Sequence, residues 1–143
     1  MADESSRMPT VVPMISYQDV AAAADWLVEA FGFEEAGRWS GADGLVLHVN
    51  LRAGDGVVML GFPSEDYESP RHHAEHCAAA REWGRSPFIV DGVLVEVAEL
   101  DRHLERARAA GATILSELEE NVEVGQRQYR VADPEGHRWM FVE

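Results

Sequence analysis

The stretch from Tyr129 to Glu143, YRVADPEGHRWMFVE, decides the fold of this 143-residue chain. Its centre, from Asp133 to Gly136, has the chemistry of a turn. Proline presets one backbone angle, glycine admits the left-handed conformation, and the acidic side chains can hydrogen-bond the local backbone. Strand-forming residues flank this turn on both sides. The stretch therefore predicts a hairpin whose second strand runs from His137 to Val142.

A related pattern occurs eighty positions earlier in the chain. The segment LRAGDGVVML, from Leu51 to Leu60, aligns with VADPEGHRWM, from Val131 to Met140. The same offset pairs the expected helix starts at Asp19 and Glu99. The sequence therefore predicts two copies of one structural unit.

Each unit contains one helical pattern among several strand patterns. Apolar residues recur at helical spacing from Asp19 to Gly32 and again from Glu99 to Gly111. Alternating or short apolar runs predict strands at 11–16, 33–40, 45–51, 56–62, 93–97, 112–118, 124–131 and 137–142. Periodicity alone thus gives an α+β class.

The chain divides into four segments that together make one compact domain. We expect a disordered lead-in at 1–10, a first unit at 11–62, a connector at 63–90 with a short helix at 73–82, and a second unit at 91–143.

Composition narrows the possible partners and the location. The net charge of -14 argues against nucleic-acid binding, because a strongly acidic surface repels phosphates, and it would favour cationic ligands. Cys77 is the only cysteine, so no internal disulfide can form. The sequence shows no signal peptide and no apolar run long enough to span a membrane. We therefore expect a cytoplasmic protein without membrane or nucleic-acid partners.

The tandem strand-helix-strand-strand-strand pattern and the terminal D-P-E-G-H-R-W-M-F resemble the vicinal oxygen chelate superfamily. This group includes glyoxalase I, bleomycin-resistance proteins and extradiol dioxygenases, and the resemblance spans about Val11 to Val142. It implies two tandem βαβββ units whose curved, half-open mixed sheets surround a cavity. It also implies a homodimer, since half-open sheets commonly pair their edges across chains.

Metal-dependent members of that superfamily carry His and Glu ligands on the first and last strands of each unit. The resemblance places the corresponding positions at Val12, Leu60, Gly92 and Met140. None of these residues is a good ligand for a divalent ion, and a shift of one residue does not change this. We therefore predict no metal and no other cofactor at the cavity, which disfavours glyoxalase and extradiol dioxygenase chemistry.

Strand alternation, started from those four positions, predicts which side chains line the cavity. His103, on the polar side of the second helix, and His137, beside the turn, are expected to contribute less. The predicted ligand-binding residues are Met14, Ser16, His48, Asn50, Leu60, Glu96, Gln128, Arg130, Arg138 and Met140.

The connector carries a second group of possible metal ligands, His72, His73, His76 and Cys77. On a helix, several of them could point the same way. A solvated polar helix face explains the same residues, so the sequence leaves metal binding by this group open.

Three functions remain in competition. The resemblance favours a metal-independent protein that binds small molecules, including cationic drugs, as bleomycin-resistance proteins do. The alternative is an enzyme of the same superfamily that uses acid-base chemistry, with His48 or Glu96 as base and Arg130 or Arg138 stabilising an oxyanion. A metal-dependent lyase or dioxygenase is the least favoured. The sequence does not identify the ligand.

Overall fold

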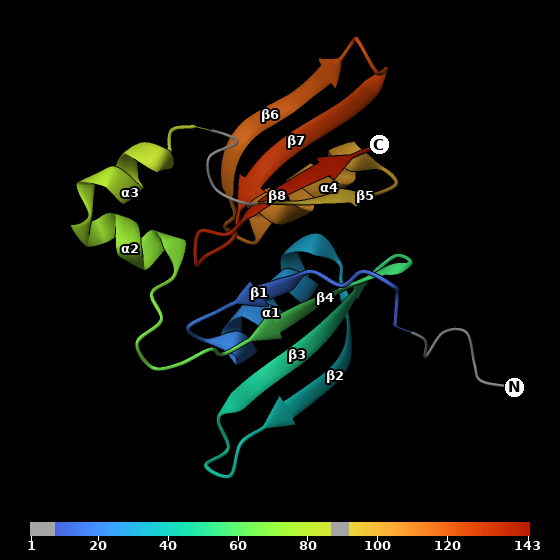
Figure 1. Ribbon diagram of the computed structural model, residues 1–143. Coiled ribbons are helices and arrows are strands. Elements are labelled where there is room, and N and C mark those ends of the chain that lie inside the picture. The colour runs from blue at the N-terminus through green and yellow to red at the C-terminus, as the bar shows by residue number, and fades with distance from the viewer. Residues whose placement is uncertain (1–7, 87–91) are drawn as a thin grey trace, which may run out of the picture.

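The chain folds into two units of the same kind in the computed structural model, which describes residues 8–86 and 92–143 (Figure 1). The first unit consists of β1 (Met14–Ser16), α1 (Val20–Phe31), β2 (Glu34–Ser40), β3 (Val46–Ala53) and β4 (Gly56–Gly61). The second consists of β5 (Gly92–Glu96), α4 (Leu100–Ala109), β6 (Thr113–Asn121), β7 (Gln126–Ala132) and β8 (Arg138–Val142). Between them lie α2 (Pro70–His76) and α3 (Ala78–Trp83).

Each unit forms one four-stranded mixed sheet. The strand orders are β1-β4-β3-β2 and β5-β8-β7-β6. The first strand of each unit runs parallel to the last, and the other neighbours are antiparallel. The predicted α+β fold with two tandem βαβββ units is confirmed.

One helix covers one face of each sheet, and the opposite face, which we call the open face, carries no helix of its own unit. Asp19 starts α1 by accepting a hydrogen bond from the amide of Ala22, and Gly32, at φ 74°, ends it. The buried residues of α1 pack against those of β3 and β4, including Val49, Leu51 and Leu60. Glu99, the expected counterpart of Asp19, makes no such cap and lies at φ 53°.

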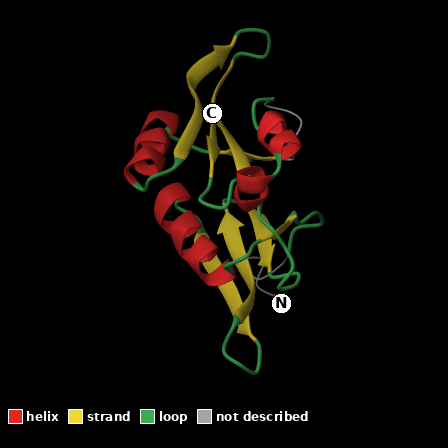
Figure 2. Cartoon of the chain, turned by 90° about the vertical axis from the view of Figure 1, so that its left-hand side faces the viewer, coloured by secondary structure: helices red, strands yellow, loops and turns green. Residues whose placement is uncertain are grey.

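The two units are joined through their helices. Figure 2 shows the two long helices together on one side of the strands. The indole NH of Trp26 donates to the carbonyl of Ala110 at 2.8 Å. Phe31, at the end of α1, reaches the second sheet, with ring centroids 5.5 Å from Trp139 and 4.7 Å from Phe141. A single hydrophobic core therefore runs through both units.

A buried carboxylate reinforces this joint. Asp133 is 3% exposed and accepts hydrogen bonds from the hydroxyl of Tyr17 at 2.6 Å and from the indole of Trp139 at 3.1 Å. Its other oxygen accepts from the amides of Glu135 and His137 and so shapes the turn before β8. The predicted turn thus closes a hairpin and also ties the second unit to the first.

The two hairpin turns differ in length by one residue, which corrects one part of the predicted register. Ala53 pairs with Gly56 across a two-residue turn. In the second unit, the amide of Asp133 donates a hydrogen bond to the carbonyl of His137 across a three-residue turn. Each residue of β4 therefore corresponds to the residue of β8 that lies 81 positions later, not 80. Leu60, predicted on the cavity side, is fully buried against the helices, so that placement is wrong.

The connector contains two short helices where one was predicted. The helix α2 starts at the Ser69 cap and ends at Cys77, from which α3 begins. The amide of Arg71 donates to the carbonyl of Glu135, and Gly136, at φ 91°, leaves room for this approach because a Cβ there would lie 2.8 Å from the Arg71 nitrogen. Most of the expected lead-in (1–7) and the end of the connector with Asp91 (87–91) lie outside the described residues. Within the described residues, no helix is long and apolar enough to cross a membrane.

Candidate functional site

The open face of the first sheet carries most of the predicted residues from that unit. Cross-strand pairing places Met14 beside Met59 and Ser16 beside Gly61. It also pairs Asn50 with Met59 and His48 with Gly61. Met14, Ser16, His48 and Asn50 thus share one face, and Met59 occupies the position that had been given to Leu60.

His48 and Asn50 form a polar pair on this face. The Nε2 atom of His48 lies 2.8 Å from the Oδ1 atom of Asn50. An amide oxygen can only accept, so Nε2 carries the proton, and in the neutral imidazole Nδ1 is then the acceptor. The ring of Trp39 lies beside the imidazole, with centroids 4.7 Å apart, and Trp39 is 51% exposed. This aromatic surface was missed from the sequence, although alternation on 33–40 and pairing with His48 could have located it.

The open face of the second sheet carries the remaining predicted residues. Strand β5 pairs with β8 so that Leu94 lies beside Met140. Strand β7 pairs with β8 so that Arg130 lies beside Met140. The predicted residues on this face are Glu96, Gln128, Arg130, Arg138 and Met140.

The two arginines already have protein partners. Arg130 forms an ion pair with Glu119 at 3.1 Å, and this bond lowers the pKa of the Glu119 carboxyl. Arg138 donates to the carbonyls of Gly84 and, at 2.9 Å, Ser86, which anchors the connector over the open face. Burial, with a smaller contribution from nearby Arg130, lowers the pKa of Arg138. Arg138 is therefore a structural residue as well as a candidate ligand contact.

In the part of the chain that the structure describes, the two open faces belong to separate sheets, and β1 and β5 are edge strands of those sheets. Apolar side chains stand out from both edges: Met14 is 78% exposed and Leu94 is 60% exposed. Nine of the ten predicted residues consequently fall into two groups, one on each open face, and Leu60 belongs to neither group.

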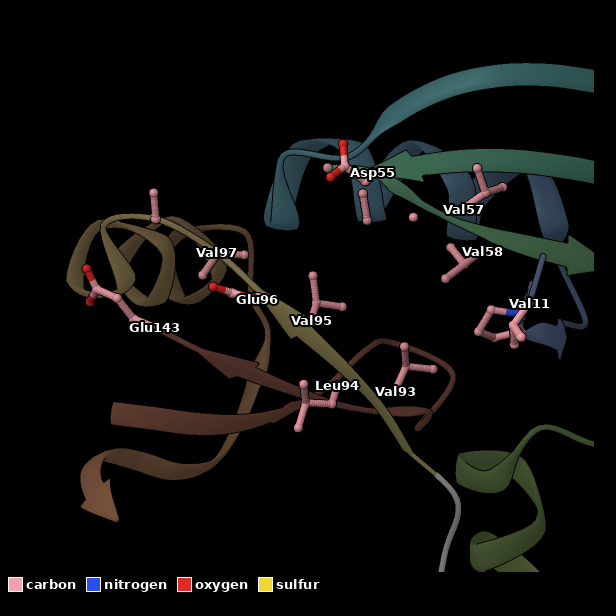
Figure 3. Close-up of a pocket in the computed structure, with 15 residues that line it drawn as sticks. Val11, Asp55, Val57, Val58, Val93, Leu94, Val95, Glu96, Val97 and Glu143 are labelled. Carbon is pink, nitrogen blue, oxygen red and sulfur yellow. The ribbon is translucent and has the colours of Figure 1, made fainter. Parts of the chain in front are cut away.

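A hollow of about 810 Å³ lies between the two units (Figure 3). Figure 3 shows Val93 and Val95 on the side of β5 that faces Val57 and Val58 of the first unit. Of the predicted site residues, only Glu96 lines this cleft. Its lining residues are Val11, Pro13, Ala53, Gly54, Asp55, Gly56, Val57, Val58, Val93, Leu94, Val95, Glu96, Val97, Ala98 and Glu143.

The chemistry of the cleft differs from that of the open faces. Its titratable lining residues, Asp55, Glu96 and Glu143, are all acidic, and its walls are mainly valine. Such walls supply apolar area but few hydrogen-bond donors. The open faces combine apolar, aromatic and convergent polar side chains, so we regard them as the stronger candidate site.

His103 and His137 serve as links between the units. The imidazole of His103 lies 2.6 Å from the hydroxyl of Tyr129 and 3.0 Å from the carbonyl of Phe31. Burial lowers the pKa of His103, and the nearby charge of Arg106 lowers it further. The prediction that His103 lies on the polar side of its helix is wrong, because α1 covers it. His137 donates to the carbonyl of Ser16 in the other unit.

The residues at the positions of the superfamily's metal ligands do not fit a metal ion. With the register corrected, these positions are Val12, Met59, Gly92 and Met140. Two thioethers, one aliphatic side chain and one glycine provide no imidazole or carboxylate for a divalent ion. No catalytic step that needs a metal there can be derived from these residues.

Comparisons with known proteins agree with this architecture. The sequence model of the Glyoxalase/Bleomycin resistance protein/Dioxygenase superfamily matches residues 10–141. A Mycobacterium tuberculosis (strain H37Rv) protein of uncharacterized function is 33% identical over 131 residues, covering 92% of this chain and 72% of its own length.

Solved structures show the same fold. The crystal structure of TioX from Micromonospora sp. ML1 is similar with a TM-score of 0.68 and 35% identity, covering 94% of each chain. A superfamily member from Sphaerobacter thermophilus has a TM-score of 0.65 at 18% identity, covering 96% of this chain and 98% of its own, and supports the fold alone. The chain therefore belongs to the Glyoxalase/Bleomycin resistance protein/Dioxygenase superfamily.

Proposed function

We propose that this protein binds a small, largely apolar or aromatic molecule against the open faces of its sheets, without a metal ion. The observation that carries the proposal is the apolar centre of these faces, which extends to the exposed Met14 and Leu94 on the edge strands. Met14 and Met59 lie side by side on one sheet, and Leu94 and Met140 on the other. Methionine is flexible and polarisable, which suits a surface that adapts to a ligand.

Polar and aromatic groups around this centre would orient the ligand. Trp39 offers a ring for stacking, and His48 offers a hydrogen-bond acceptor at Nδ1. On the second sheet, Gln128 and Glu96 add polar contacts. Apolar walls with a few convergent polar groups are typical of small-molecule sites.

The proposal includes a homodimer that completes the cavity. Each chain presents two open faces and two edge strands with exposed apolar side chains. Pairing β1 of one chain with β5 of another would cover those edges and bring two open faces together. Light scattering at micromolar concentration should give twice the mass of one chain, and a monomer would contradict this step. A cytoplasmic location also belongs to the proposal and can be tested by cell fractionation.

The charge of the ligand is left to experiment. The net charge of -14 favours cations over the whole molecule. Arg130 and Arg138 offset that acidity on the second open face. A screen by thermal shift should therefore include cationic antibiotics, aromatic acids and thiol conjugates, with quenching of tryptophan fluorescence as the second readout.

Variants test where the ligand binds. The changes His48→Ala, Glu96→Ala and Arg138→Ala should each weaken binding of a compound found in the screen. Lost hydrogen bonds of about 0.5–1.5 kcal/mol, or about 1.5–3 with charge, correspond to a roughly threefold to hundredfold loss of affinity. Arg102→Ala, on the exposed surface of α4, is the control and should change nothing. The proposal would be contradicted if Arg102→Ala lost as much ligand affinity as the three other variants. It would also be contradicted if EDTA treatment of the unmodified protein abolished ligand binding and added metal restored it.

The second candidate function is a metal-free acid-base enzyme, and the geometry of His48 favours it. In the neutral imidazole its Nδ1 atom is an acceptor, and the bond to Asn50 orients the ring. A general base needs such an acceptor within reach of a substrate proton. Turnover of a bound compound that disappears in His48→Ala, while binding is retained, would establish this function over simple binding.

A further inference from the structure

The connector contains two histidines at the correct spacing to share a metal ion. Helix α2 is fixed at its start, because Ser69 accepts a hydrogen bond from the amide of His72 and Pro70 occupies the first turn. His72 and His76 are four residues apart and therefore lie on the same side of the helix. Their ring centroids are 5.8 Å apart.

A carboxylate completes the group from outside the helix. The Nε2 atom of His76 lies 2.9 Å from Oε2 and 3.0 Å from Oε1 of Glu68. One ligand atom from each of Glu68, His72 and His76 lies within 4.8 Å of the others. In the part of the chain that the structure describes, this is the one set of three such side chains that converges.

The distances fit an ion after small side-chain rotations. A tetrahedral ion with bonds of about 2.0–2.1 Å places its ligand atoms roughly 3.3 Å apart. All three side chains are exposed, so they can adjust and an ion can enter without opening the fold. The Glu68–His76 contact also shows that this carboxylate, which precedes α2, already reaches the imidazole at the end of the helix.

The neighbouring residues are arranged differently. The ring of His73 lies 5.8 Å from that of His76 and 6.2 Å from that of Trp83, but no His73 nitrogen belongs to the group of converging ligand atoms. Cys77 ends α2 with an extended backbone and is partly buried. The structure therefore selects His72 and His76 from the four residues suggested by the sequence and adds Glu68, which sequence spacing had not indicated.

We propose that Glu68, His72 and His76 bind one divalent transition-metal ion of the Zn²⁺, Co²⁺ or Ni²⁺ type. Imidazole and carboxylate donors suit these ions, whereas Mg²⁺ and Ca²⁺ prefer sites made of oxygen alone. Three protein ligands leave a coordination position for water or for an added small ligand. The ion would tie the segment before Ser69 to the end of α2. Figure 1 shows α2 and α3 beside the two sheets.

The test is a titration of chelator-treated, full-length protein with Co²⁺, followed by the visible absorption of the bound ion and by competition with Zn²⁺. One ion per chain is expected. Removing a residue that merely orients a ligand costs about 10- to 100-fold in metal affinity, so removing a ligand should cost about 100-fold or more. His72→Ala, His76→Ala and Glu68→Gln should show this loss.

His73→Ala is the matched control, since it removes the same side chain from the same helix. It should retain one ion with unchanged affinity and spectrum. Circular dichroism checks folding, and Glu68→Gln tests the site without altering the helix itself. The proposal is overturned if His73→Ala weakens binding as much as His76→Ala, or if Glu68→Gln binds as the parent does. It also fails if the parent binds Co²⁺ more weakly than about 1 mM.

Discussion

The hydroxyl of Tyr17 should contribute more to the free energy of unfolding than the hydroxyl of Tyr67, which bonds a neutral group. Tyr17 is 1% exposed and donates to the carboxylate of Asp133 over 2.6 Å, linking the two units. Burial and, after it, the charge of Asp133 raise the pKa of Tyr17 far above its ordinary value, so the hydroxyl stays protonated and remains a donor. Tyr17→Phe removes only the oxygen and keeps the ring in place.

The expected magnitude follows from the charged acceptor. A hydrogen bond to a charged group is worth about 1.5–3 kcal/mol, against about 0.5–1.5 kcal/mol between neutral groups. Tyr67→Phe is the matched control, because the hydroxyl of Tyr67 donates to the neutral carbonyl of Ser16 at 3.0 Å. Tyr17→Phe should thus lower the free energy of unfolding by about 1 kcal/mol more than Tyr67→Phe does.

Urea unfolding followed by circular dichroism measures both losses. Protein concentration must be held constant, because association of chains would add to the apparent stability. The slope of free energy against urea should stay the same in both variants, since neither changes the buried area. If Tyr17→Phe proves no more destabilising than Tyr67→Phe, the hydrogen bond from Tyr17 to Asp133 does not stabilise the contact between the units.

Three further changes test the core, its pH response and the approach of the connector. Trp139→Ala should cost about 3–5 kcal/mol in urea unfolding, because it empties a buried site between the units; a loss below 1 kcal/mol would contradict its core placement. The lowered pKa of His103 means that the unfolded chain binds the proton more readily, so this group stabilises the fold above about pH 6.5 and the benefit is lost as pH falls. His103→Gln should flatten the dependence of the unfolding free energy on pH between about 7.5 and 5. An unchanged slope would contradict a lowered pKa of His103 in the folded protein. Gly136→Ala should lower the melting temperature more than Gly111→Ala does, since both positions have positive φ but only a Cβ at position 136 would press against Arg71. Equal losses would show that the contact between Gly136 and the connector does not contribute to stability.

Alternation within strands predicted the two faces of β8 correctly. On β8, Trp139 and Phe141 are buried under the helices, while Arg138 and Met140 face the other way, as their alternating pattern indicated. A strand exposes its two faces in strict order, so one correct anchor fixes all its residues. The ligand-equivalent position at Met140 supplied that anchor on the last strand.

The error at Leu60 shows the limit of this reasoning. The alignment of the two units at a constant offset carried the register of β8 onto β4. The turn before β8 has one residue more than the turn before β4, and a single residue reverses both faces of a strand. A separate reading of β4 from its own two-residue turn would have placed Met59 on the open face.

How the two units pack could not be derived from the repeat. A repeat predicts two similar units but is compatible with sheets joined at their edges or with helices packed together. The structure shows the second arrangement, in which Phe31 of one unit inserts beside Trp139 and Phe141 of the other. The polar side chain of His103 gave no sign that it would be covered by α1, because its partner is the backbone carbonyl of Phe31.

This packing determines what a binding site in the protein needs. Because the helices hold the units together, the open faces remain on separate sheets, and among the described residues no strand pairs with the outer side of β1 or β5. Met14 and Leu94 are exposed on those two edge strands. In a lone chain, these open edges and their apolar side chains would favour aggregation. A second chain that pairs with these edges would cover the apolar side chains and convert two half-sites into cavities. Ligand binding at the open faces should therefore depend on dimer formation. A variant that remains monomeric should lose ligand binding even with every ligand-contacting side chain intact.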